Sequence, residues 1–124
     1  MSSNLEAINL SGGSRKIFLL ILLLFMIGSV QAHAPANVTL NYDLASHFLK
    51  VTITHPVKDP TSHYIKHIDL TKNNETVLSQ DYTTQPKTPE FTYSYKLNAT
   101  AGDRLTAKVI CSIIGSRVGN LIVT

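Results

Sequence analysis

The alternation of apolar and polar side chains constrains the fold of this chain more than any other feature. It is clearest over residues 91–97, FTYSYKL, where aromatic or apolar side chains occupy every second position. A period of two places these side chains on one face of a half-buried β-strand. Further short strands are expected at residues 38–42, 47–55, 64–70, 76–82, 105–111 and 121–123. Seven short strands without helical periodicity predict an all-β domain, a seven-stranded antiparallel immunoglobulin-like β-sandwich.

Turn-forming residues separate these segments. Asn73-Asn74 suits a tight hairpin turn between the third and fourth strands. Residues 85–89, QPKTP, read as a connector at one end of the structure. Gly115 and Gly119 are expected to frame a last turn before the closing strand.

The first 32 residues are typical of an export signal. Arg15 and Lys16 precede an apolar run at residues 17–27, which is followed by small residues up to Ala32. The run is shorter than the roughly 18–20 residues that span a bilayer comfortably. Residues 1–32 are therefore interpreted as a signal peptide, or as an uncleaved N-terminal membrane anchor, in either case a helix ahead of the domain. Both readings predict an extracytoplasmic domain at residues 33–124, secreted or anchored to the outer face of a membrane.

Composition narrows the possible partners. The whole chain has 11 Lys and Arg against 8 Asp and Glu, and residues 1–32 contain Glu6, Arg15 and Lys16, so the remainder has a net charge of about +2. Its basic residues are scattered and Trp is absent, which argues against nucleic-acid binding. The single cysteine, Cys111, cannot form an internal disulfide. It is a buried hydrophobe, an intermolecular thiol in a homo-oligomer, or a metal ligand.

Three Asn-x-Thr triplets mark candidate glycosylation positions. They begin at Asn37, Asn74 and Asn98, all at expected strand starts or turns. Such positions predict that these side chains are exposed to solvent.

Histidines bracket one loop of the expected sandwich. His55 falls on the apolar side at the end of the second strand, and His63 begins the third. His67 is expected on the same strand face as His63, two pleats further on. Cys111 closes another alternating strand. Imidazole and thiolate donors suit iron, copper or zinc, so these residues predict a metal site.

His33 adds a further possible ligand. Signal cleavage after Ala32 would make it the first residue, where its α-amino group and imidazole together favour copper.

The motifs around this loop resemble a known family. His55-Pro56, a short loop, His63-Tyr64-Ile65 and then Cys111 are similar to the ferrous iron-binding domain of desulfoferrodoxin and neelaredoxin, the superoxide reductases. The resemblance covers about residues 49–123. It implies a seven-stranded immunoglobulin-like sandwich with mononuclear iron held by four histidines in a plane and one axial cysteine. The implied activity is reduction of superoxide to hydrogen peroxide, with the electron supplied by an external donor.

The resemblance implies His55 and His63 as equatorial ligands and Cys111 as the axial thiolate. Ile114 occupies the position where the family has another histidine. The loop between His55 and His63 is two residues longer than usual, and the family's early Glu-Lys-His segment is not recognisable. His33 or His67 would then be an additional ligand.

Lys58, in the loop between the two histidines, is a weak catalytic candidate, because its positive charge would attract the superoxide anion. The alternatives are a copper- or zinc-binding protein and a non-catalytic extracytoplasmic β-sandwich module that keeps only the fold.

Overall fold

The computed structural model describes residues 33–124, together with Lys16. The signal or anchor predicted for residues 1–32 therefore lies outside the described residues, apart from that one position. Residues 33–124 belong to one compact unit. Within the described part of the chain, no helix has the length and apolar character needed to cross a membrane.

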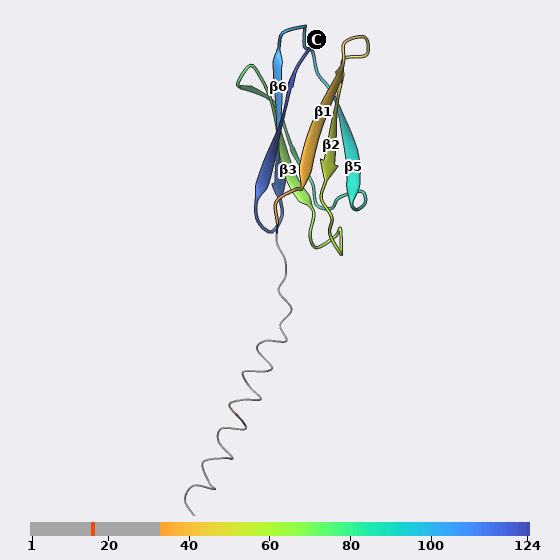
Figure 1. Cartoon of the computed structure of the whole chain (residues 1–124), viewed down its shortest axis with the longest axis vertical. Coiled ribbons are helices and arrows are strands. Elements are labelled where there is room, and N and C mark those ends of the chain that lie inside the picture. Colours follow the sequence, from red (N-terminus) through yellow and green to blue (C-terminus); the bar gives the residue numbers. More distant parts are fainter. Residues whose placement is uncertain (1–15, 17–32) are drawn as a thin grey trace, which may run out of the picture. The chain divides into compact units, whose positions relative to one another are not determined.

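Seven antiparallel strands form two sheets, which confirms the prediction of an all-β, two-sheet domain (Figure 1). Their bounds are β1 (Asn37–Asp43), β2 (Phe48–Thr54), β3 (Ile65–Lys72), β4 (Glu75–Asp81), β5 (Glu90–Lys96), β6 (Arg104–Cys111) and β7 (Ser116–Ile122). The strand order is β1-β2-β5 in one sheet and β4-β3-β6-β7 in the other. In a constant-type immunoglobulin domain the fourth strand belongs to the first sheet. Here β4 pairs with β3 in the second sheet instead.

Local turn chemistry explains the β3–β4 hairpin. Asn73 and Asn74 have φ angles of +52° and +69°, the left-handed conformation that a two-residue hairpin loop requires and that asparagine tolerates. The side chain of Asn73 accepts a hydrogen bond from Arg104 N at 2.9 Å and donates one to Asp103 Oδ1 at 2.9 Å. The turn is thereby tied to the start of β6.

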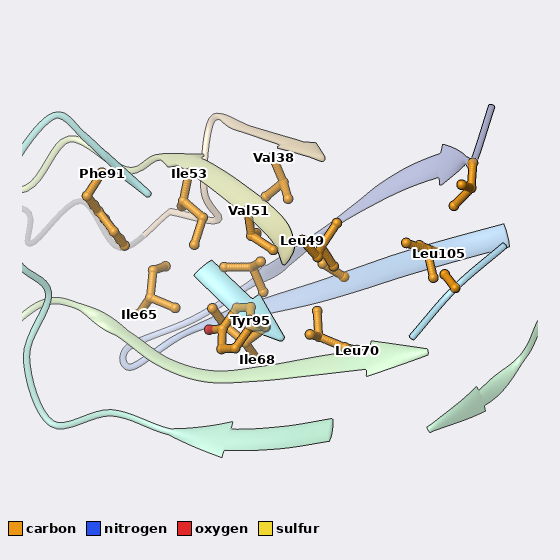
Figure 2. Close-up of a cluster of buried hydrophobic side chains, with 14 residues drawn as sticks. Val38, Leu49, Val51, Ile53, Ile65, Ile68, Leu70, Phe91, Tyr95 and Leu105 are labelled. Carbon is orange, nitrogen blue, oxygen red and sulfur yellow. The ribbon is translucent and has the colours of Figure 1, made fainter. Parts of the chain in front are cut away.

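The core lies between the two sheets. Figure 2 shows Val51 and Ile53 of β2 on one side, with Ile65 and Ile68 of β3 on the other. All four side chains are fully buried. Their period-two spacing in each strand matches the alternation in the sequence, apart from a β-bulge between Ile65 and His67. The buried cluster comprises Val38, Leu49, Val51, Ile53, Ile65, Ile68, Leu70, Phe91, Tyr95, Ala99, Leu105, Ala107, Val109 and Val123.

Two strand boundaries differ from the sequence prediction. His47 belongs to the turn before β2, with a φ of +59°. The predicted last turn between two glycines is wrong, because β7 begins at Ser116 and Gly119 lies buried inside it. A Cβ on Gly119 would lie 2.8 Å from Val38 Cγ1 and from Val38 O. Glycine is therefore present because β1 and β7 approach each other closely at this edge of the sandwich.

Several connections meet at one end of the sandwich. In Figure 1 the loop after β2 and the β6–β7 connection lie at the same end, opposite the C-terminus. Antiparallel pairing requires this, because Ile65 at the start of β3 pairs with Cys111 at the end of β6. His55 and His63 lie in the loop after β2, and Cys111 is the last residue of β6, so these three predicted metal ligands lie at this end.

Candidate metal centre

His55 is the most deeply buried of the candidate ligands. It directly follows β2 and continues the inward-facing series of Val51 and Ile53, with no exposed surface. Its Nδ1 lies 2.8 Å from Gln85 Oε1. Its Nε2 is buried and has no hydrogen-bond partner among the described residues. An unpartnered buried polar atom costs about 1–3 kcal/mol, so this nitrogen requires an explanation.

His63 and Cys111 are brought together by the pairing of β3 with β6. Ser112 N donates to Tyr64 O at 2.8 Å, and Tyr64 N donates to Ser112 Oγ at 3.1 Å. These two bonds join the residue after His63 to the residue after Cys111. As a result, His63 Nε2 lies 3.1 Å from Cys111 Sγ. The two atoms are thus within hydrogen-bonding distance of each other. A nitrogen and a sulfur bound to one zinc at about 2.0–2.1 and 2.3 Å with the tetrahedral angle would be about 3.5 Å apart, so a small shift would give this pair the spacing of two ligands of one ion.

Cys111 is a free cysteine with 2% of its surface exposed. Its sulfur receives a weak hydrogen bond from Ile113 N at 3.5 Å. Its backbone N donates to Gly115 O at 3.0 Å, closing the turn that leads into β7. One ligand atom each from His55, His63 and Cys111 lie within 4.8 Å of one another.

His33 reaches the same place from the segment before β1. Ala36 N donates to Thr54 O at 2.7 Å, beside His55, and Arg117 Nε donates to Pro35 O at 2.6 Å. These bonds attach the segment to β2 and to β7. His33 is therefore held near these candidate ligands although it is distant from them in the sequence, but the group whose ligand atoms all lie within 4.8 Å of one another contains only His55, His63 and Cys111.

Gly115 lets this segment pack closely. Its φ of +90° lies in the left-handed region, and a Cβ there would lie 2.9 Å from Ala34 Cβ. A side chain at this position would push the segment away from the β6–β7 turn.

The three imidazoles form a triangle. The ring centroids lie 5.3 Å apart for His33 and His55, 5.3 Å for His33 and His63, and 4.8 Å for His55 and His63. Imidazoles that bind one ion at about 2.0–2.1 Å have centroids about 4.5–5.5 Å apart. The ring of His33 donates from Nδ1 to Ala34 O at 3.1 Å, which leaves its Nε2 with a free lone pair.

The electrostatics of the triangle favour the neutral form of His63. Burial lowers the pKa of His63 from its ordinary value, and the nearby rings of His55 and His33 lower it further. A neutral ring is the form that binds a metal, so the environment of His63 prepares it as a ligand.

His67 is not part of this group. Its Nδ1 lies 2.6 Å from Asp81 Oδ1 and its Nε2 lies 2.9 Å from Asp69 Oδ1. Both ring nitrogens are thus engaged by carboxylates. The expectation that His67 shares a strand face with His63 is wrong, because His63 lies before β3 and a bulge separates Ile65 from His67.

The remaining sequence candidates lie at the surface. Lys58 is exposed in the loop between His55 and His63. Ile114 is 61% exposed and offers no ligand atom where the resembling family has a histidine. The side chains of the three glycosylation candidates, Asn37, Asn74 and Asn98, are exposed, as expected, and their modification stays a prediction.

Two residues that support the site had no signal in the sequence. The sequence indicates for Gln85 only a place in a connector, yet its side chain contacts His55, 30 positions away. Arg117 is one of several scattered basic residues, yet it bonds to Pro35 across 82 positions. Neither periodicity nor motif spacing reports such long-range pairs.

Comparison with known proteins gives structural matches only. No family model and no curated protein matches the sequence. Among solved structures, a superoxide reductase from Nanoarchaeum equitans matches with 19% identity and a TM-score of 0.44, covering 73% of this chain and 92% of that one. A superoxide reductase (neelaredoxin) from Ignicoccus hospitalis matches with 18% identity and a TM-score of 0.43, covering 74% and 81%. With scores this low, the likeness carries no weight of its own, and fold and site rest on the strands and side chains described above.

Proposed function

We propose that this end of the sandwich binds a single metal ion through His55, His63 and Cys111, with His33 as a fourth ligand. The observation that carries the proposal is the buried Nε2 of His55, which has no hydrogen-bond partner within residues 33–124. A bound cation would satisfy this lone pair and would sit beside the adjacent His63 Nε2 and Cys111 Sγ.

Iron is the proposed metal, with copper or zinc as alternatives. Three imidazoles and one thiolate suit all three ions. Zinc would be favoured if the four protein donors closed a tetrahedral structural site. Iron would be favoured if a further position stayed open, and the exposed Ile114 supplies no side-chain ligand to fill it.

The proposed reaction is that of a superoxide reductase, in which superoxide, one electron and two protons give hydrogen peroxide. Bound iron would supply the one-electron redox chemistry, with its electron restored by an external donor. The chain's own contribution would be the thiolate of Cys111, which donates electron density, and the amide of Ile113, which moderates it by a hydrogen bond. Lys58, exposed in the loop beside the site, would attract the superoxide anion.

The proposed setting is extracytoplasmic. The basic residues and apolar run of residues 1–32 support export of the domain, with cleavage or retention of the segment as a membrane anchor. Cleavage after Ala32 would place a free α-amino group on His33, next to two further imidazoles, which favours the copper alternative.

Metal analysis and visible absorption test the proposal. Residues 33–124, which carry the complete core, would be produced with ferrous iron under reducing conditions and then oxidised. We expect about one iron per chain and a thiolate-to-iron absorption band. Cys111 is the only cysteine, so Cys111→Ser should abolish the band.

A matched control is His47→Asn, which changes an exposed histidine outside the site and keeps a residue that tolerates the positive φ there. This variant should bind iron as the wild type does. A colourless wild-type protein would contradict the iron site. Zinc or copper at unit stoichiometry would instead identify the metal, and absence of all three would leave a non-catalytic module.

A further inference from the structure

Gln85 is a buried polar residue in the connection between β4 and β5. Only 3% of its surface is exposed. Its backbone N donates to Pro60 O at 3.2 Å, in the loop between the two ligand histidines. A buried glutamine must satisfy both ends of its amide, so its contacts define its orientation.

The amide nitrogen of Gln85 donates to two backbone carbonyls. Nε2 lies 3.0 Å from His55 O and 3.0 Å from Lys87 O. A carbonyl oxygen only accepts hydrogen bonds. The reversed amide would place its oxygen against both carbonyls, so the nitrogen must be the atom that faces them. The oxygen, Oε1, is therefore the atom that faces the His55 ring.

This orientation determines the tautomer of His55. Oε1 accepts, so the ring nitrogen at 2.8 Å, Nδ1, must carry the proton. In the neutral ring, Nε2 then has the lone pair, and it is this atom that is buried without a partner in the described part of the chain. The bond from His55 N to Pro89 O, at 2.7 Å, holds the backbone as well. Ring orientation and proton position are thus both set before any ion binds.

We propose that Gln85 is a positioning residue that makes His55 a ligand through Nε2. The tautomer assignment depends only on the contacts of Gln85, whereas the use of His55 as a ligand rests on the proposed metal site. Partners of this kind commonly change metal affinity about 10–100-fold when they are removed. A glutamine, unlike a carboxylate, holds the ring without adding negative charge to the site.

The first test is made on the metal-free protein. Long-range ¹H–¹⁵N correlation spectra of the histidine rings, recorded at mildly alkaline pH where imidazoles are neutral, report which nitrogen carries the proton. In the wild type we expect His55 to be protonated at Nδ1. In Gln85→Met, which keeps the length and removes the acceptor, we expect a mixture of tautomers. A wild-type proton on Nε2, or a pattern unchanged in Gln85→Met, would overturn the proposal.

The second test measures zinc affinity by competition with a chromophoric chelator. Gln85→Met should bind zinc about 10–100-fold more weakly than the wild type. Gln85→Glu keeps an acceptor for Nδ1 but has no N–H for His55 O and Lys87 O, so it should retain the Nδ1-protonated tautomer in a less stable protein. Gln80→Met is the matched control, because Gln80 is an exposed glutamine on β4, and it should match the wild type.

The two tests separate the two ideas. A wild type with the expected tautomer and no zinc or iron binding would sink the proposed metal site and leave the tautomer assignment standing. Wild-type zinc affinity retained in a folded Gln85→Met would overturn the positioning role. If Gln85→Met does not fold, the wild-type spectrum decides the matter, because a proton on His55 Nε2 overturns the proposal.

Discussion

His67 shows how two carboxylates change the behaviour of a histidine. It lies between Asp69 and Asp81, and hydrogen bonds to Asp81 and then to Asp69 raise the pKa of its imidazole. The pKa of Asp69 is lowered, first by the Ser79 hydroxyl and then by His67, with Lys108 contributing. The group therefore favours a charged imidazolium held between β3 and β4, in contrast to His63, whose pKa is lowered.

This arrangement predicts a pH dependence of stability. A raised folded-state pKa means that the stabilisation is fully present below the unfolded value, about 6.5, and is lost as the pH rises through the folded-state pKa. This stabilisation also requires ionised Asp69, whose lowered pKa sets the lower pH limit. His67→Gln should therefore lower the free energy of unfolding at pH values just above that ionisation and have little effect at alkaline pH. Urea unfolding across this pH range measures the loss of stability in His67→Gln relative to the wild type. The control variant His47→Asn should not show this pH dependence. A loss that grew with pH would contradict the interaction of His67 with the two aspartates.

At the scale of the strands, the close approach of β1 and β7 closes one edge of the sandwich. Gly119 leaves space for the backbone of Val38, and a Cβ at 2.8 Å from Val38 O would force β1 to move. Gly119→Ala should destabilise the domain by about 1–3 kcal/mol, as overpacking does. Chemical denaturation gives the value, and Ser116→Ala, an exposed position in the same strand, should leave it nearly unchanged. If Gly119→Ala unfolded with the same free energy as the wild type, the close approach of β1 and β7 would not limit stability.

At the scale of the whole molecule, the candidate metal centre depends on segments from both ends of the domain. The bond from Arg117 Nε to Pro35 O attaches the segment that carries His33 to β7. Arg117→Gln should weaken metal binding about tenfold, the order of effect of a lost supporting contact, and should change stability little, because the core is untouched. Titration with zinc measures the affinity, and Arg104→Gln, an exposed arginine on β6, is the control.

A double-mutant cycle identifies the route of this effect. If Arg117 acts through His33, then Arg117→Gln should have no further effect on affinity in a His33→Ala background. Equal losses in both backgrounds would contradict a shared role. Unchanged affinity in His33→Ala would exclude His33 as a ligand.

The strands and the turn between β3 and β4 are determined by the sequence alone. Alternation is a local pattern, and it identified the β-strand character of all seven segments and the inward direction of His55. The Asn73-Asn74 pair predicted the β3–β4 hairpin, because asparagine tolerates the positive φ angles that its turn requires. The boundary of β7 was misjudged because Gly119 resembles a turn residue locally, whereas its role is to admit Val38 from another strand.

Only the tertiary structure decided which of these residues meet. Pairing of β3 with β6 places His63 against Cys111, and the attachment of residues 33–36 to β2 and β7 adds His33. The same folding assigns His67 to two aspartates and gives His55 its partner in Gln85. Periodicity can be read from residues that are close in the sequence, whereas contacts across 30 to 82 positions form only when the sheets pack. That is why the strands could be predicted from the sequence, while the composition of the candidate metal centre required the fold.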